Sequence, residues 1–249
     1  MSRPQYQKSC GITSLTACFN YLFSHMGEST QNRRPLLTQE QALEILGFAQ
    51  PFDEIRFGPF SGNSSLIKWF NQLCKHFGVK GQARIFYKPR GTKNVTSEYT
   101  PKTAWKALKA GLANSNRAYV YHCYNHYMCP VGFEEQPLEK HTVFKKDLEH
   151  GKDTEPWMIV ADQAKPQPTF TCLKWSTVLQ DLNMENPEFL DVRNLHRGVQ
   201  VKENIEPHKR GKNCHCILEF CAIRPRERKK PTHGASGDVT QPRARPIFL

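Results

Sequence analysis

Apolar residues in the N-terminal half of the chain recur every three or four positions, which is the spacing of helices with one buried face. Ile12, Leu15 and Phe19 begin the first of these stripes. Thr38 and Gln41 have the spacing of a capping box, so a second helix is expected to start there. The pattern predicts helices over residues 10–24, 38–46, 64–77 (with Ser64 as N-cap), 101–112 and 175–182.

Shorter runs of aromatic and β-branched residues in the C-terminal half predict strands. Tyr124 and Asn125 separate two of these runs and are expected to form the turn between an outgoing and a returning strand. The expected strands cover residues 83–87, 118–123, 126–133, 157–161 and 215–223. Because helices come first and antiparallel strands follow, the order favours an α+β fold in which N-terminal helices pack on an antiparallel sheet.

The chain divides into one large domain and a short tail. We expect a single domain over residues 1–223, in which the polar segment 134–155 is a surface insertion between strands. Residues 224–249 carry seven Lys or Arg against two Asp or Glu and are rich in Pro, so we expect this basic tail to be disordered.

The net charge and the cysteines of the chain narrow the expected partners and location of the protein. The net charge of +12 favours an anionic partner, either an acidic protein or nucleic acid, and the Arg224–Lys230 segment, which also resembles a nuclear import signal, is the expected contact. The chain contains no apolar run near the roughly 20 residues that span a membrane, and its start lacks the apolar core of a signal peptide. Nine irregularly spaced cysteines favour free thiols inside the cell.

Cys10 carries the strongest chemical signal in the sequence. It stands where a loop turns into the first predicted helix, so it faces unpaired backbone N–H groups and the positive end of the helix dipole. Both favour the thiolate and lower the pKa of the thiol. A thiolate is the form that attacks a carbonyl carbon. A buried structural cysteine is the competing interpretation.

A thiolate nucleophile needs a base, and the base needs an orienting group. His126 begins the predicted strand 126–133, and Asp162 ends the predicted strand 157–161. If these two strands pair side by side and the first helix packs on their sheet, the three side chains meet at one edge. The sequence therefore predicts a site made of Cys10, His126 and Asp162.

This order of motifs resembles the papain-like cysteine peptidases, above all those of the bacteriocin-processing type, over about residues 4–180. The resemblance implies a papain-like fold in which Cys10 is the nucleophile, His126 is the base and Asp162 orients the base.

The same family places an oxyanion-hole glutamine six residues before the cysteine, and this chain has Pro4 there. Gln5 and Gln7 are the candidates for that role, because a side-chain amide must reach the developing oxyanion. The separation between the histidine and the aspartate is also longer than in the family, since the predicted insertion 134–155 lies between them.

A second resemblance extends along most of the chain. It is carried by the phrases Arg3–Tyr6, Ser9–Ile12, Ile55–Phe60, Tyr121–Cys123, Asn125–Tyr127 and Asn186–Asp191. These resemble the basic immunoglobulin-like variable motif-containing family over about residues 3–220. The resemblance implies a longer N-terminal region in other members and a location in cytoplasm and nucleus, and it implies no particular reaction. The Tyr-x-Cys of the fourth phrase is immunoglobulin-like, but the helices predicted before it favour a local similarity of one strand.

Histidines and cysteines also gather in two short segments, which raises the question of a zinc site. The first segment holds His122, Cys123, His126 and Cys129, and the second holds Cys214, His215, Cys216 and Cys221. Zinc prefers four tetrahedral Cys or His ligands, whereas neighbouring side chains on a strand point to opposite faces. The spacings match no familiar zinc finger, so we expect no metal and no cofactor.

Two functions follow from these observations. The first is a thiol hydrolase or acyl transferase that acts through Cys10 on a peptide, an isopeptide or a glutamine amide. The second is an inactive scaffold of the same fold that binds an acidic protein or nucleic acid through its basic surface and tail. The reactivity of Cys10 toward an electrophilic thiol probe separates the two.

Overall fold

A computed structural model of the chain describes residues 8–24, 34–50, 62–142, 144, 148, 152–164 and 169–223. Its helices are α1 (Cys10–Phe23), α2 (Gln39–Ile45), α4 (Asn63–His76), α5 (Pro101–Leu112) and α6 (Trp175–Leu182). Its strands are β1 (Gly81–Tyr87), β2 (Arg117–Cys123), β3 (His126–Pro137), β4 (Thr154–Asp162), β5 (Thr169–Lys174), β6 (Glu188–Leu190), β7 (Val199–Val201) and β8 (Cys216–Ala222). Short 3₁₀ turns cover Lys140–Thr142, Leu195–Arg197 and Pro207–Lys209.

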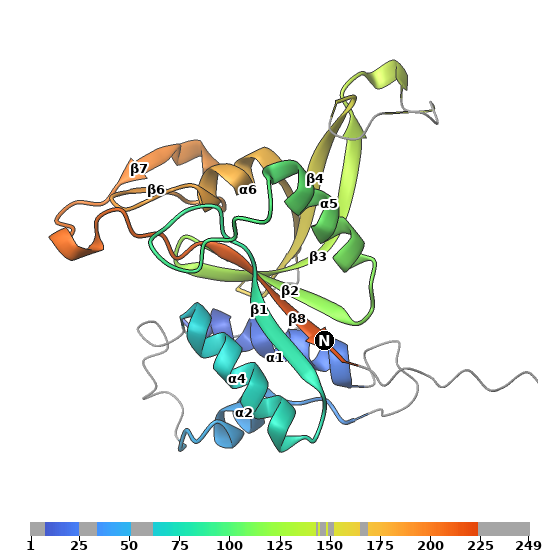
Figure 1. The fold of residues 1–249 in the computed structure, drawn as a ribbon, viewed down its shortest axis with the longest axis vertical. Helices are drawn as coiled ribbons and strands as arrows, with labels where there is room; N and C mark the ends of the chain where they lie inside the picture. The colour runs from blue at the N-terminus through green and yellow to red at the C-terminus, as the bar shows by residue number, and fades with distance from the viewer. Residues whose placement is uncertain are drawn as a thin grey trace, which may run out of the picture.

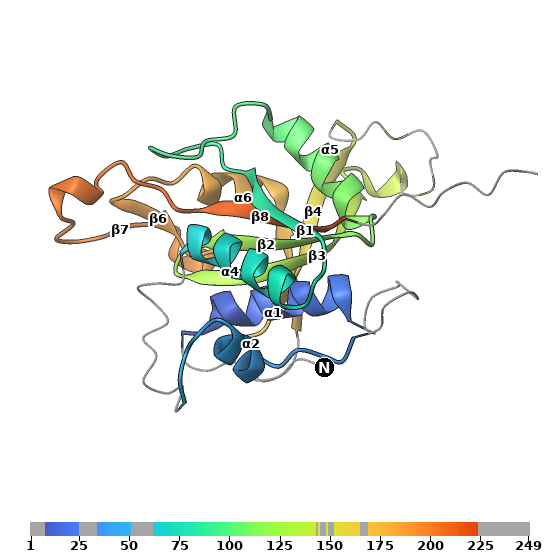
Figure 2. The ribbon, with the colours of Figure 1, turned by 60° about the horizontal axis from the view of Figure 1, so that its bottom comes forward.

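The strands form a six-stranded antiparallel sheet in the order β1-β8-β2-β3-β4-β5, and β6 pairs with β7 in a separate hairpin. Helices α1, α2 and α4 lie on one face of the sheet (Figure 1), and Figure 2 shows α5 and α6 on the other. The α+β class and the packing of N-terminal helices on an antiparallel sheet are thereby confirmed. Among the described residues, every helix is too short or too polar to cross a membrane.

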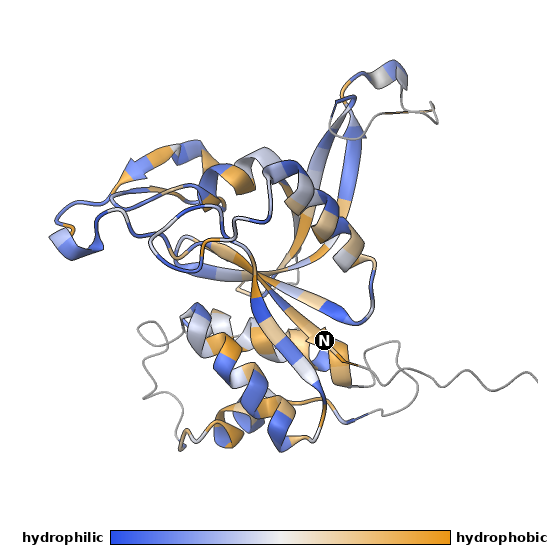
Figure 3. Ribbon diagram, in the orientation of Figure 1, coloured by the Kyte–Doolittle hydropathy of each residue, from blue (hydrophilic) through white to orange (hydrophobic). Residues whose placement is uncertain are grey.

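Two apolar layers, one on each face of the sheet, hold the helices in place. On the α1 face the ring centroids of Phe19 and Phe70 lie 6.2 Å apart, and those of Phe70 and Phe220 lie 4.9 Å apart. On the opposite face the rings of Trp105 in α5 and Trp175 in α6 lie 5.2 Å apart. Apolar residues concentrate where helices meet the sheet (Figure 3). Burial of these rings supplies much of the free energy that docks the helices.

The N-termini of α2 and α4 show how far local sequence signals predict where a helix begins. The Gln41 N–H donates to Thr38 Oγ1 at 3.2 Å and the Thr38 N–H donates to Gln41 Oε1 at 2.9 Å, so the predicted capping box is confirmed. The predicted N-cap Ser64 is wrong, because Gly62 caps α4 and Asn63 is its first residue. The side chain of Asn63 instead reaches across to the sheet.

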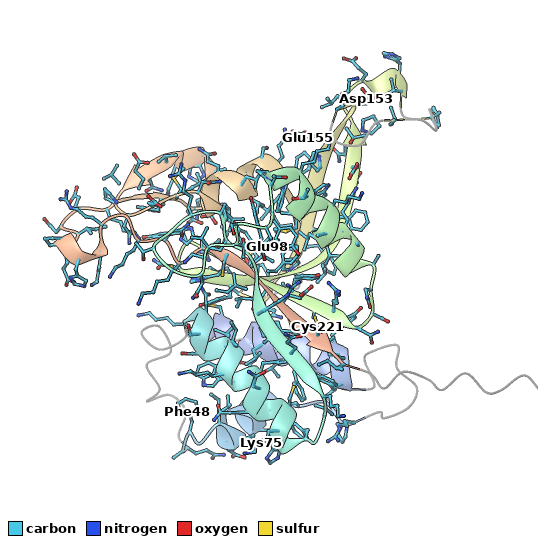
Figure 4. The ribbon with its side chains drawn as sticks, in the orientation of Figure 1. Phe48, Lys75, Glu98, Asp153, Glu155 and Cys221 are labelled. Atoms are coloured by element: carbon cyan, nitrogen blue, oxygen red, sulfur yellow. The ribbon has the colours of Figure 1, made fainter. Side chains whose placement is uncertain are left out.

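The predicted insertion 134–155 is in part a continuation of the sheet. Strand β3 runs on to Pro137 and β4 starts at Thr154, with Glu135 opposite Pro156. Glu135 accepts hydrogen bonds from Trp105 Nε1 at 3.0 Å and from Lys109, so α5 holds the base of this hairpin. Figure 4 shows Glu155 out along the hairpin, away from α1 and α4. The polar composition of the segment therefore marks an exposed hairpin whose arms are strands.

Strand β5 and the β6–β7 hairpin are elements that the hydrophobic pattern did not predict. Each of β6 and β7 has three residues, too few to show a period, and exposed Phe170 lies on the solvent face of β5. Strand β2, which carries the immunoglobulin-like phrase, lies inside a single sheet with helices on both faces. An immunoglobulin domain has two facing sheets instead. The tail 224–249 lies outside the described residues.

Candidate active site

Three polar side chains meet at the end of the sheet where α1 begins. Cys10 is the first residue of α1, His126 is the first residue of β3, and Asp162 is the last residue of β4. Residues with positive φ precede two of them, Lys8 (63°) before Cys10 and Asn125 (49°) before His126. Asn adopts left-handed backbone readily in turns, so Asn125 is suited to the turn between β2 and β3, whereas the same conformation is unfavourable for Lys8.

Asp162 orients the ring of His126. His126 Nε2 lies 2.7 Å from Asp162 Oδ1, and both residues are 3% exposed. The Ala164 N–H donates to the same carboxylate oxygen at 3.0 Å. Burial raises the pKa of Asp162, but the hydrogen bond and the charge of His126 outweigh burial, so the pKa is lowered overall. The carboxylate therefore stays ionised and fixes the ring.

The other side of the ring faces the sulfur of Cys10. Because Nε2 is bonded to Asp162, Nδ1 is the ring nitrogen that remains for the hydrogen bond between His126 and Cys10. Burial raises the pKa of Cys10, yet the hydrogen bond and charge of His126, together with backbone N–H groups of Tyr127 and Gly11, lower it overall.

The pKa of His126 shifts in the opposite direction to that of Cys10. Burial lowers the pKa of the ring, but hydrogen bonds with Asp162 and Cys10 raise it overall. A lowered thiol pKa beside a raised imidazole pKa shifts the pair toward thiolate and imidazolium. Both shifts are in the direction expected of a thiol that is activated as a nucleophile.

The N-terminus of α1 contributes backbone donors to this site. The first helical hydrogen bond runs from the Thr13 N–H to the carbonyl of the N-cap residue at 3.0 Å. The N–H groups of Cys10 and Gly11 precede it, where a helix presents donors to an anion. Gln5 and Gln7, the predicted oxyanion donors, lie outside the described residues.

A second layer of polar contacts lies one helical turn beyond Cys10, and sequence reasoning missed it. Ser14 Oγ lies 3.4 Å from Gln163 Oε1 and 3.5 Å from the Tyr127 carbonyl oxygen. Gln163 Nε2 lies 3.8 Å from Cys129 Sγ. These contacts join α1, β3 and the residue that follows β4, which are the elements that carry the site. The signal that could have found Ser14 is its spacing of four from Cys10, since residues four apart share a helix face.

The β6–β7 hairpin supports the turn that precedes His126. Phe189 of β6 stacks on Tyr124 with ring centroids 4.0 Å apart. Lys202 Nζ lies 4.9 Å from the centroid of the Tyr124 ring and 2.8 Å from Asn186 Oδ1. A cation over a stacked aromatic pair is stabilising, so this hairpin holds the turn from outside the sheet.

The other histidines and cysteines do not assemble into a metal site within the described ranges. His122 and Cys123 point to opposite faces of β2, as strand alternation requires. His122 stacks on Tyr127 with centroids 4.1 Å apart, and the Cys123 thiol donates to the His126 carbonyl at 3.6 Å. Burial and the neighbouring His215 lower the pKa of His122 to about 3, so its ring is neutral. In that part of the chain, no group of three His, Cys, Asp or Glu side chains is placed to hold an ion.

Comparison with known proteins places the chain in a family. The sequence model described as basic immunoglobulin-like variable motif-containing protein matches residues 1–227. Relatives of that name from Mus musculus and Homo sapiens are each 45% identical over 220 residues, which cover 88% of this chain and 42% of theirs. A relative of the same name from Giardia intestinalis is 30% identical over 222 residues, covering 81% of this chain and 78% of its own. The chain thus spans less than half the length of the vertebrate relatives, and it belongs to the basic immunoglobulin-like variable motif-containing protein family.

Proposed function

We propose that this chain is a thiol hydrolase or acyl transferase of papain-like fold with Cys10 as its nucleophile. The observation that carries the proposal is the continuous contact from the Cys10 sulfur through the His126 ring to the Asp162 carboxylate. Catalysis by an activated thiol requires a nucleophile, a base and an orienting group in this order. The substrate class is an acyl group on nitrogen, in a peptide, an isopeptide or a glutamine amide.

The arrangement of the elements supports the papain-like part of the proposal. Helix α1 carries the nucleophile at its N-terminus and packs against β2 and β3. Strands β3 and β4 are neighbours in the sheet, so a histidine that opens one and an aspartate that ends the other fall at the same edge. This is the order of parts that the sequence resemblance implies.

The chemistry follows from the charges of the site. Cys10 attacks the carbonyl carbon as a thiolate, and the resulting oxyanion meets the Cys10 backbone N–H together with Gln5 or Gln7. The His126 imidazolium gives its proton to the leaving nitrogen, and an acyl thioester remains on Cys10. The neutral ring then takes a proton from water or from an acceptor amine, whose attack releases the acyl group and restores the thiolate.

The test of the nucleophile is the rate at which each cysteine of the full chain reacts with iodoacetamide at pH 7, measured by peptide mass mapping. Cys172, an exposed thiol of β5, is the internal reference. We expect Cys10 to react at least about tenfold faster than Cys172 despite its burial, because reaction requires the thiolate. A Cys10 that reacts more slowly than Cys172 refutes the proposal.

The test of the reaction offers the chain three substrates in parallel: a peptide, an isopeptide-linked pair of peptides and a glutamine amide. The expected product is an acyl thioester on Cys10 that hydroxylamine removes and that Cys10→Ser does not form. A reactive Cys10 that forms no adduct with any of the three refutes the hydrolase assignment. That result favours the scaffold that binds an acidic protein or nucleic acid through Arg224–Lys230.

A further inference from the structure

A pair of buried thiols lies between α1 and β3, deeper along α1 than Cys10. Cys18 belongs to α1 and Cys129 to β3, and the two residues are 4% and 6% exposed. The two thiols are close enough for each to shift the pKa of the other. Cys129 Sγ also lies 3.8 Å from the carbonyl oxygen of Ser14, one turn before Cys18, and Cys18 Sγ lies 3.5 Å from the carbonyl oxygen of Tyr119. Both sulfurs are therefore held at one contact between helix and sheet.

We propose that Cys18 and Cys129 form a second thiol centre, which hydrogen peroxide oxidises reversibly to a disulfide between α1 and β3. Formation of this disulfide does not depend on catalysis by Cys10. The regulation of the Cys10 site that follows from it rests on the proposed function.

The surroundings of the two sulfurs assign them different roles. Gln163 Nε2 lies 3.8 Å from Cys129 Sγ and donates a hydrogen bond to it, which favours a thiolate. Cys18 Sγ instead donates to the Tyr119 carbonyl oxygen at 3.5 Å, which favours the protonated thiol. Cys129 is therefore assigned as the sulfur that meets the oxidant and Cys18 as the thiol beside it, and the pKa shifts have the same sense, lowered for Cys129 and raised for Cys18. A reactive thiolate next to a resolving thiol is the usual arrangement of a redox-sensitive pair.

The oxidation is a two-step reaction in which hydrogen peroxide is the only added reagent. The Cys129 thiolate attacks one peroxide oxygen, the O–O bond breaks, and Cys129 becomes a sulfenic acid. The hydroxide that leaves takes up the proton that the Cys129 thiol released on ionising, which gives the first water. The Cys18 sulfur then attacks the Cys129 sulfur, the S–O bond breaks, and water leaves with the proton from Cys18. Two thiols and one peroxide thus give one disulfide and two waters.

The burial of both sulfurs favours a small oxidant over a large one. Hydrogen peroxide is close to water in size and can reach a sulfur through a small opening, whereas oxidised glutathione must bring a tripeptide against it. Cys172 and Cys214 are exposed and offer glutathione direct access. We therefore expect peroxide to form the internal disulfide and oxidised glutathione to form mixed disulfides at the exposed thiols.

The disulfide would act on the Cys10 site through α1. A disulfide bond of about 2 Å is shorter than the separation of two sulfurs that are not covalently bonded, so oxidation draws α1 and β3 together. Cys10 lies eight residues before Cys18 on the same helix, and His126 lies three residues before Cys129 on the same strand. Because a shift near 1 Å between a nucleophile and its base is costly, we expect Cys10 alkylation to slow by about tenfold.

The experiment treats the full chain with hydrogen peroxide, blocks the remaining thiols with N-ethylmaleimide in denaturant, and maps peptides by mass without reduction. The expected result is a linked Cys18–Cys129 peptide two hydrogens lighter than its parts, which dithiothreitol separates. Cys18→Ser and Cys129→Ser must each abolish the link. The matched control is Cys123→Ser, which removes a buried thiol of β2 and should leave the link intact.

A second measurement covers the case in which the pair variants do not fold. In the wild-type chain, the melting temperature after peroxide should rise and should return with dithiothreitol, because the link constrains a long loop of the unfolded chain. Repetition in Cys10→Ser separates the two proposals, since the linked peptide should still form there. The proposal is overturned if Cys18 and Cys129 both remain alkylable in denaturant after a peroxide dose that oxidises Cys10.

Discussion

The described part of the molecule holds two buried His–Asp pairs, and they sit in different chemical surroundings. His126 Nε2 lies 2.7 Å from Asp162 Oδ1 beside α1, and His215 Nδ1 lies 2.9 Å from Asp181 Oδ1 beside α6. All four residues are buried. Distance and burial are similar in the two pairs, but only Asp162 hydrogen bonds to its histidine through the carboxylate, since Asp181 Oδ1 has no hydrogen-bond partner within the described residues.

The two pairs differ in the third group that each contacts and in the atoms to which each histidine ring hydrogen bonds. The His126 ring is bonded to a carboxylate on one side and to the Cys10 thiol on the other. The His215 ring hydrogen bonds to the backbone carbonyl of Asp181 at 3.1 Å, and the carboxylate of Asp181 accepts from the Tyr121 hydroxyl at 2.5 Å. Burial and the charge of Asp181 raise the pKa of Tyr121, so its hydroxyl stays neutral.

The comparison teaches that a His–Asp pair does not by itself make a reactive site. The His126 pair adjoins a thiol whose pKa is lowered, as the proposed relay requires, whereas the Asp181 pair adjoins a hydroxyl whose pKa is raised, as in a structural hydrogen bond. The Asp181 cluster joins α6 to β2 and to the residue before β8, which is a packing role.

The largest expected effect is the difference between removing the His126 ring and removing the His215 ring. His126→Ala should slow Cys10 alkylation at pH 7 by about a hundredfold, because a neighbouring opposite charge shifts a pKa by about one to three units and each unit is a tenfold change in thiolate. His215→Ala should change that rate by less than about twofold and lower the melting temperature instead, since it removes a buried polar contact. The measurement is peptide mass mapping after timed exposure to iodoacetamide. Equal effects of the two variants on Cys10 would contradict the distinction between the pairs.

The second prediction removes the charge of each aspartate. Asp162→Asn should slow Cys10 alkylation by about tenfold, because one pKa unit corresponds to a tenfold change in thiolate and the uncharged amide stabilises the imidazolium less. Asp181→Asn should leave the rate unchanged and lower the denaturant midpoint, since Tyr121 loses its charged acceptor. An unchanged rate in Asp162→Asn would show that the carboxylate has no electrostatic role at Cys10.

The third prediction concerns the pH dependence of the same reaction. Because the pKa of Cys10 is lowered, its alkylation should rise with pH through a midpoint below that of an ordinary thiol and level off above it. Loss of the Asp162 charge lowers the pKa of His126, which in turn raises that of Cys10, so Asp162→Asn should move the midpoint to higher pH. Asp181→Asn is the control and should leave the midpoint in place. A wild-type midpoint at the ordinary thiol value would argue against the ion pair.

The smallest expected effect is on two contacts between a hydroxyl group and a glutamine, which two consecutive residues of α1 make. Ser14 contacts Gln163 beside the site, whereas Thr13 Oγ1 donates to Gln39 Oε1 of α2 at 2.8 Å. Gln163→Ala should slow Cys10 alkylation a few-fold, about what a displacement well below 1 Å would cause. Gln39→Ala should lower the melting temperature and leave the rate of alkylation unchanged. If Gln39→Ala slowed the reaction as much, the effect would belong to α1 as a whole.

Local patterns in the sequence were sufficient for most helices and for the central strands. The predicted helices 101–112 and 175–182 agree with α5 and α6, and the Thr38 capping box is present. The turn at Tyr124–Asn125 also forms as predicted. These features depend on residues within a few positions of each other, so a single stretch of sequence contains the interactions that stabilise them.

Long-range contacts could not be predicted in the same way. The stack of Phe189 on Tyr124 joins residues far apart in the chain, as do the contact of Gln163 with Ser14 and the thiol pair of Cys18 and Cys129. The periodicity of apolar residues does not indicate which distant side chains become neighbours, because that depends on how the helices pack on the sheet.

By itself, the sequence determined the α+β class, the helix that begins at Cys10, and the strand ends occupied by His126 and Asp162. The tertiary structure alone decided that the three side chains touch, that the His126 ring turns Nε2 to the carboxylate, and that His215 is bonded to a backbone carbonyl instead. The physical reason is that propensity and periodicity act along the chain, whereas the pKa of a thiol depends on which charges and donors packing brings against it.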